Sequence, residues 1–146
     1  MPMAPATHGA ERQPGAPAVE YYASGAYLQI HPTVQDDEAP WKAGQVVALL
    51  AKHQIVPHRL LDVGCGPGGV LDILVSRAFP GAIGVGYDVA PDAIHRAERR
   101  RVGNEALTFH CGDVTAEELE SQVYDVLLCL DVFEHVDDYI GFLRRL

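Results

Sequence analysis

The chain has 146 residues and a formal net charge of −9. Because this negative charge repels a phosphate backbone, it argues against nucleic acid as a substrate. No apolar run reaches membrane-spanning length, so we expect no membrane segment. The three cysteines are widely spaced without a CxxC pair, which fits reduced thiols in a cytoplasmic protein better than a disulfide framework or a zinc site.

The chain begins with two segments that differ in composition. Residues 1–20 are rich in Pro, Ala and Gly and have no apolar periodicity, which predicts a disordered tail, and they lack the apolar stretch of a secretory signal. Residues 21–57 form a lead-in whose helix starts near Pro40 and ends before Pro57, a segment that could act as a lid with Trp41 and Lys42. Its apolar stripe comprises Ala43, Val46, Val47 and Leu50.

From residue 58 to residue 146, strand and helix patterns alternate. We expect strands at residues 59–63, 82–87, 106–111 and 124–130. Helical patterns cover residues 71–78, 91–101 and 136–143, and a short helix is predicted from the capping-box pair Thr115 and Glu118. Alternation of this kind predicts right-handed crossovers and an α/β fold with a doubly wound parallel, Rossmann-like sheet.

The fourth predicted strand indicates that the fold is incomplete. Its VLLCL run is apolar at every position, as in a strand buried on both faces in the middle of a sheet. Only one helical pattern follows it, so no further strand covers its edge. We therefore expect either a fragment of a longer protein or a homo-oligomer in which another chain covers this edge.

A glycine-rich turn follows the first predicted strand. Within LLDVGCGPGG, Gly64, Gly66 and Gly69 satisfy GxGxxG between a strand and a helix, and Cys65 is a small residue of the loop. This context fits a nicotinamide dinucleotide or S-adenosylmethionine. The carboxylate of Asp62, two residues before Gly64, separates the two, because it repels a diphosphate and attracts an ammonium and a sulfonium.

Acidic residues also follow the next two predicted strands. Asp88, at the end of the second, can accept both hydroxyls of a ribose, a feature shared with NAD enzymes. Asp113 follows the third predicted strand. It could bind a ligand, or it could have only the structural role of capping the turn at Thr115. The carboxyl ends of parallel strands meet at one edge of the sheet, where ligands bind, so we expect Asp62, Asp88 and Asp113 to line one site.

The DVGCGPG segment resembles the first motif of the class I S-adenosylmethionine-dependent methyltransferases. The resemblance covers about residues 59–146 and extends to CLDVFEHV, which is similar to small-molecule methyltransferases of the ubiquinone-biosynthesis type that carry an EHV-like segment. It implies that Asp113 accepts the adenine amine and that Leu130 flanks the cofactor. The full predicted cofactor-binding set is Asp62, Gly64, Cys65, Gly66, Gly69, Asp88, Val89, Asp113, Val114 and Leu130.

The EHV-like segment leaves three roles open. His135 could act as general base toward a hydroxyl acceptor, because an imidazole titrates near neutral pH. Asp131, Glu134 and His135 could instead hold a divalent metal, or Glu134 and His135 could cap the next helix. We name His135 as the catalytic candidate and assign no metal ligand.

These patterns predict methyl transfer from S-adenosylmethionine to an O, N or C atom of a small molecule. The GxGxxG turn and Asp88 leave an NAD-dependent oxidoreductase as one alternative. A non-catalytic cofactor-binding or assembly module is the other, because later strands would have to complete an acceptor site.

Overall fold

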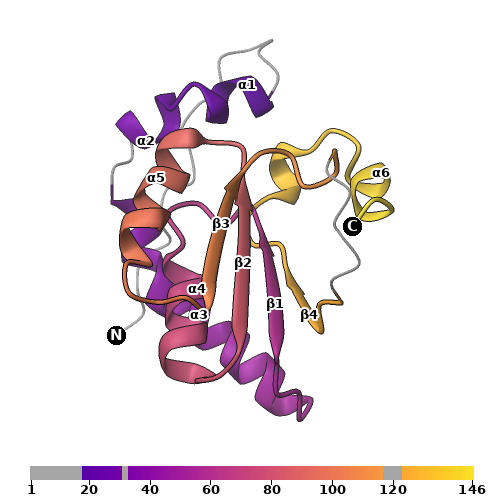
Figure 1. Cartoon of the computed structure of the whole chain (residues 1–146). Helices are drawn as coiled ribbons and strands as arrows, with labels where there is room; N and C mark the ends of the chain where they lie inside the picture. Colours follow the sequence, from indigo (N-terminus) through magenta and orange to yellow (C-terminus); the bar gives the residue numbers. More distant parts are fainter. Residues whose placement is uncertain (1–17, 31–32, 117–122) are drawn as a thin grey trace, which may run out of the picture.

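The computed structural model describes residues 18–30, 33–116 and 123–146, and its centre is a parallel sheet (Figure 1). The strand order is β3-β2-β1-β4, with every neighbouring pair parallel. The strands are β1 (Arg59–Val63), β2 (Ile83–Asp88), β3 (Leu107–Cys111) and β4 (Val126–Leu128). The predicted α/β parallel fold is confirmed, although β4 is shorter than the predicted range of residues 124–130.

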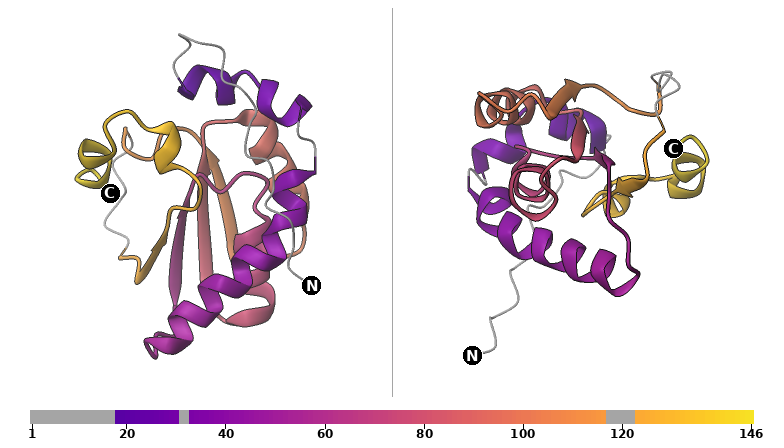
Figure 2. Two further views of the ribbon diagram at one scale, coloured as in Figure 1. Left: turned by 180° about the vertical axis from the view of Figure 1, so that it is seen from behind. Right: turned by 60° about the horizontal axis from the view of Figure 1, so that its bottom comes forward.

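Helices alternate with these strands as the sequence predicts. The helices are α1 (Ala18–Ala23), α2 (Ala26–Ile30), α3 (Val34–Lys52), α4 (Gly69–Ile73), α5 (Pro91–Arg100) and α6 (Tyr139–Leu143). A π-helical turn (Leu74–Ala78) continues α4, and a 3₁₀ turn (Phe133–His135) follows β4. Figure 2 shows α3 across one face of the sheet and α6 beside β4.

The face of the sheet under α3, α4 and α5 carries the larger hydrophobic core. Leu60 of β1, Leu71 of α4 and Leu107 of β3 are at most 1% exposed. Close approach of α4 to β2 requires Gly84, because a Cβ there would lie 2.9 Å from the side chains of both Leu71 and Val75. This packing fixes the start of α4, and with it the loop that follows β1.

The N-terminal part differs from the prediction in two places. Helix α1 begins at Ala18, so residues 18–20 of the predicted tail are helical, and residues 1–17 lie outside the described part. Helix α3 begins at Val34, and Pro40 lies inside it instead of near its start. The first turn holds Asp36 and Asp37, whose carboxylates interact favourably with the positive end of the helix dipole. These interactions and the tertiary contacts of the turn place the helix start six residues before Pro40.

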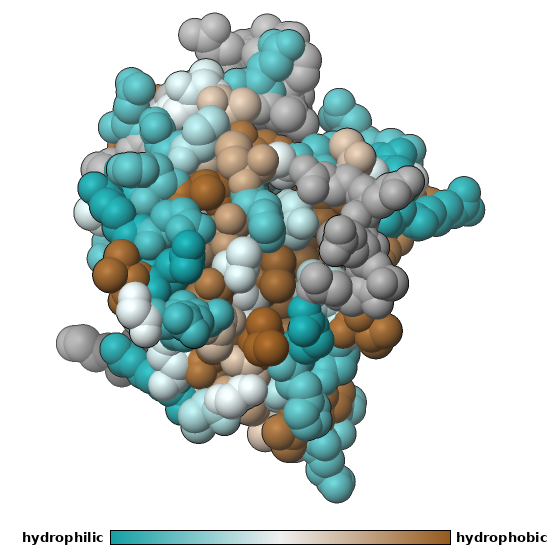
Figure 3. Space-filling model, viewed as in Figure 1, coloured by the Kyte–Doolittle hydropathy of each residue, from teal (hydrophilic) through white to brown (hydrophobic). Residues whose placement is uncertain are grey.

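The opposite face of the sheet is covered less completely. Its core cluster joins Leu61 and Tyr87 to Phe142 of α6. The prediction that the fourth strand is buried on both faces is wrong, because Leu127 is 40% exposed. In the predicted stripe of the last helix, Tyr139, Ile140 and Leu143 are about half exposed. Figure 3 shows apolar side chains at the surface along this face.

Two further expectations concern the short helix predicted after the third strand and membrane-spanning segments. The capping-box partner Glu118 lies outside the described residues, so the short helix predicted from Thr115 is not described. Within the described ranges, no helix combines the length and apolar character needed to cross a membrane.

Candidate functional site

The loop between β1 and α4 has a backbone that only glycine adopts easily. Gly64 and Gly66 have φ angles of 76° and 53°, in the left-handed region. A Cβ on Gly64 would collide with the side chain of Val132, and one on Gly66 would lie 2.8 Å from Oε1 of Gln35. The backbone N–H groups of Gly64 and Cys65 donate to the carbonyl of Tyr87, which ties the loop to β2.

Asp62 is a carboxyl buried beneath this loop. It lies near the end of β1, is 3% exposed, and is the only charged or polar residue in the described core. Burial first, and then the charge of Asp88, raise the pKa of Asp62 to about 7, while the ammonium of Lys42 acts in the opposite direction. A cation placed beside this carboxyl would favour its ionised form.

Asp88 is held firmly at the end of β2. Its Oδ2 accepts a hydrogen bond from the N–H of Gly66 at 2.8 Å, and its Oδ1 accepts one from the N–H of Ala90 at 2.8 Å. Burial raises the pKa of Asp88 above its ordinary value, although these backbone donors act against the rise. The structure therefore brings Asp62, Asp88 and the glycine loop together, as the strand-end argument expects.

Asp113 lies at the end of the same edge, after β3, but its carboxylate is engaged locally. Oδ1 accepts hydrogen bonds from the N–H of Thr115 at 2.9 Å and from its hydroxyl at 2.7 Å. This is the turn-capping geometry that the sequence left as the alternative. The carboxylate is exposed and remains available to a ligand on its outer side.

The remaining predicted cofactor residues take supporting positions. Cys65 and Gly69 are buried, and burial raises the pKa of the Cys65 thiol well above its ordinary value, so the thiol is no activated nucleophile. Val114 is buried in the core of the less covered face. Val89 and Leu130 are half-buried, the latter against the larger core.

Helix α3 lies over the glycine loop, a contact that the sequence did not reveal. The carboxamide of Gln35 faces Gly66, and a Cβ on Gly69 would lie 2.9 Å from Cβ of Ala39. Arg100 of α5 fastens this contact: Nε donates to the carbonyl of Pro67 at 3.0 Å, and Nη2 pairs with Asp36. The polar start of α3 has no apolar pattern, so only tertiary structure shows what it covers.

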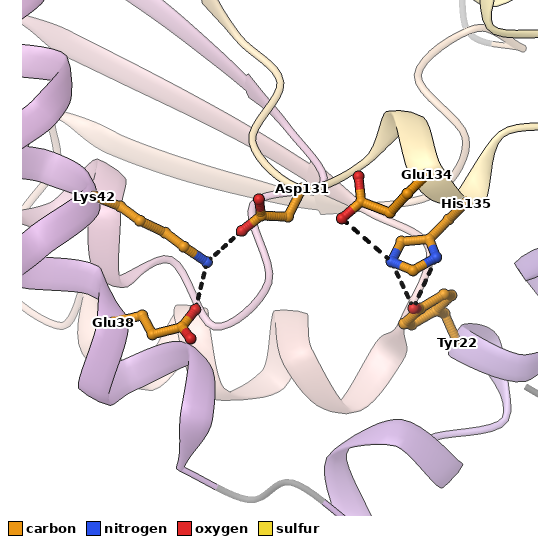
Figure 4. A network of polar contacts seen from close by, with 6 residues as sticks. All are labelled: Tyr22, Glu38, Lys42, Asp131, Glu134 and His135. Carbon is orange, nitrogen blue, oxygen red and sulfur yellow. Dashed lines mark hydrogen bonds and ion pairs between the residues drawn. The ribbon is translucent and has the colours of Figure 1, made fainter. Parts of the chain in front are cut away.

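Two polar contacts join the N-terminal helices to the segment after β4 (Figure 4). Nζ of Lys42 lies 2.6 Å from Oδ2 of Asp131 and 2.8 Å from Oε2 of Glu38. The hydroxyl of Tyr22 lies 2.9 Å from Nε2 and 3.2 Å from Nδ1 of His135. The rings of Tyr22 and His135 are 4.8 Å apart, so α1 holds the imidazole in place.

Asp131 points away from the other two members of the predicted metal set. Its carboxylate faces Lys42, and its backbone has a φ of 56° (Figure 4). Oε1 of Glu134 lies 3.9 Å from Nε2 of His135. Across the described ranges, no group of three or more His, Cys, Asp or Glu side chains is arranged to hold a metal ion.

Sequence comparison matches residues 61–146 to a family model described as a methyltransferase domain. Over 87 residues the chain is 41% identical to a ubiquinone biosynthesis O-methyltransferase of Cereibacter sphaeroides, which covers 58% of this chain and 34% of that protein. Over 92 residues it is 30% identical to a trans-aconitate 2-methyltransferase of Rhodopseudomonas palustris, a match that covers 63% of this chain and 34% of that protein. The chain thus spans about a third of the length of these relatives.

Solved structures resemble the same fold. The plantazolicin methyltransferase BpumL, solved with a monoazolic desmethylPZN analog and SAH, matches with a TM-score of 0.72 and 24% identity, over 88% of this chain and 50% of that one. The N-terminal domain of EvdMO1 with SAH bound matches with a TM-score of 0.61 and 21% identity, over 70% of this chain and 43% of that one. At these identities the likeness concerns the fold.

Proposed function

Because the chain belongs to the family of methyltransferase domains, we propose that it carries the cofactor-binding part of an S-adenosylmethionine-dependent methyltransferase acting on a small molecule. The observation that carries this proposal is a pair of carboxyls, the buried Asp62 and the half-buried Asp88, around a glycine loop at the ends of adjacent parallel strands. Two of the matched relatives are named a ubiquinone biosynthesis O-methyltransferase and a trans-aconitate 2-methyltransferase, and structural neighbours were solved with SAH.

The chemistry of these groups fits a cationic nucleoside. S-adenosylmethionine supplies a methyl group activated on a sulfonium, and its amino-acid end carries an ammonium. The carboxyl of Asp88 faces the ribose hydroxyls in this proposal, and the carboxyl of Asp62 favours the cationic end. Both groups oppose a diphosphate at short range, which weighs against the oxidoreductase alternative.

We assign the proton-accepting role toward a hydroxyl acceptor to His135. Its imidazole lies on the turn after β4, and the hydroxyl of Tyr22 contacts both ring nitrogens, so the ring is packed against α1. A positioned base contributes about 10²–10⁴-fold to a proton-transfer step. In this proposal the ring takes the acceptor proton as the methyl group is transferred.

The proposed organisation has a cover and a binding domain. Residues 21–57 form the cover, supported by the contacts of α3 with Gly66 and Gly69, and residues 58–146 form the binding domain. We propose a cytoplasmic location from the three unpaired cysteines, and self-association through the exposed edge of β4. The net charge of −9 supports a small-molecule acceptor over nucleic acid.

Titration calorimetry with S-adenosylhomocysteine and with NAD tests this function. We expect the former to bind and the latter to give no heat. Asp88→Asn removes a charged hydrogen-bond acceptor and should weaken S-adenosylhomocysteine by about tenfold or more. Asp72→Asn is the matched control, because that carboxylate bonds Ser76 on the outer surface of α4. Binding of NAD with no response to S-adenosylhomocysteine would overturn the proposal.

A further inference from the structure

Two polar atoms in the helices that cover the site are buried without a hydrogen-bond partner in the described part of the chain. They are the hydroxyl oxygen of Tyr21 in α1 and Oε1 of Gln35 in α3. A buried acceptor without a donor is costly, so buried polar atoms are paired in nearly all native structures. An orphaned acceptor beside a binding loop has the capacity to accept a hydrogen bond from a donor on a ligand.

The carboxamide of Gln35 lies directly over the glycine loop. A Cβ built on Gly66 would be 2.8 Å from Oε1, 3.1 Å from Cδ and 3.3 Å from Nε2 of Gln35. The N–H of the same Gly66 donates to Asp88. The carboxamide thus borders the loop at the residue that joins it to the acidic end of β2.

The position of Gln35 is fixed by its helix. Asp36, the next residue, pairs with Arg100, whose Nε also donates to the loop carbonyl of Pro67. Ala39, one turn later, packs on Gly69. Because these two residues are held against the loop, the backbone of α3 at Gln35 is fixed over it.

The helix face that carries Gln35 is turned toward the β1–β4 side of the site. Glu38 and Lys42 follow Gln35 at three and seven residues, on the same face of α3. Lys42 reaches Asp131 after β4 and influences Asp62 of β1. The proposed function gives Asp88, on β2, to the nucleoside and leaves to the amino-acid end the β1–β4 side, which this face of α3 borders through Lys42.

We propose that Gln35 is a cofactor-binding residue whose carboxamide oxygen accepts a hydrogen bond from the ammonium of the cofactor's amino-acid end. This inference rests on the proposed function and adds a ligand contact from outside the strand ends. It also gives the start of α3 a role in binding as well as in covering the loop.

The test compares two ligands that differ in the amino-acid end. S-adenosylhomocysteine carries the ammonium, whereas 5′-methylthioadenosine keeps the adenine and ribose and lacks it. Gln35→Leu should weaken S-adenosylhomocysteine about tenfold and leave 5′-methylthioadenosine unchanged, as expected for loss of a hydrogen bond to a charged group. Gln45→Leu, an exposed position on the same helix, is the matched control and should change neither.

A second variant separates binding from folding. Gln35→Glu keeps an acceptor in place and should bind S-adenosylhomocysteine at least as tightly as the original protein, with thermal unfolding confirming the fold of each variant. Equal weakening of both ligands by Gln35→Leu, no weakening of either, or equal losses in the Leu and Glu variants would each overturn the inference. Failure of the unaltered protein to bind S-adenosylhomocysteine would instead overturn the proposed function.

Discussion

The two sides of the sheet differ in how completely they are covered. On the side of α3, α4 and α5, Leu60, Leu71 and Leu74 have no exposed surface. Beside β4, by contrast, Leu127 and Leu143 are 40% and 50% exposed. The glycine loop, Asp62 and Asp88 belong to the first side, whereas His135 follows β4. The difference teaches that the glycine loop, Asp62 and Asp88 rest on a tightly packed core, while the proposed acceptor side is open.

The largest expected effect is a difference in stability between substitutions on the two sides of the sheet. Leu60→Ala should lower the free energy of unfolding by about 3 kcal/mol, because it removes a fully buried side chain and leaves a cavity. Leu143→Ala should cost under about 0.5 kcal/mol at its exposed position. Urea denaturation measures both. Equal losses would show that the side around β4 is as tightly packed as the other.

Cofactor binding should depend on pH through the carboxyl of Asp62, on the covered side of the sheet. The pKa of Asp62 is raised to about 7 in the folded protein, above the ordinary value of 3.8, so the unliganded protein loses stability as pH rises through about 7. A bound cation favours the carboxylate and releases this proton. Affinity for S-adenosylmethionine should therefore rise up to about tenfold per pH unit from about pH 5 to 7, and then level off.

Calorimetry across this pH range, in buffers of different ionisation enthalpy, measures the affinity and the released proton. Asp62→Asn should flatten the profile, because the titrating group is gone. Asp137→Asn, an exposed carboxylate beyond β4, is the control and should leave the profile intact. A slope that survives in the Asp62 variant would assign the proton to another group.

The smallest effect concerns the contact that joins the two sides. Lys42→Met keeps the apolar stem and removes the pairing with Asp131, whose side chain is 57% exposed. Because solvent screens this pair, we expect a loss of about 0.5–1 kcal/mol in the free energy of unfolding. A double-mutant cycle with Asp131→Ala isolates the coupling, and a coupling energy of zero would show that the sides are independent here.

Local patterns were enough to predict most of the covered side. The first strand, the glycine turn and the positions of Asp62 and Asp88 depend on short-range sequence and on the rule that parallel strands end at one edge. The contact of Tyr22 with His135 joins residues 113 positions apart, and no local pattern indicates it. The same holds for Gln35 over Gly66 and for the start of α3, which tertiary contacts decide.

The open side was predicted less well for a physical reason. The apolar run around Leu127 carries the pattern of a strand buried on both faces, but burial depends on elements that lie across from it. In the described part of the chain, 40% of the surface of Leu127 is exposed. The prediction was therefore wrong because the residues of a strand do not show which elements pack against it.

The crystal structure of the protein with S-adenosylhomocysteine tests the central claim most directly. We expect the ribose hydroxyls on the carboxylate of Asp88 and the amino-acid end between the glycine loop and Gln35, close to Asp62. A ligand seated elsewhere, with the loop still closed by α3 and no contact to either acidic residue, would contradict it.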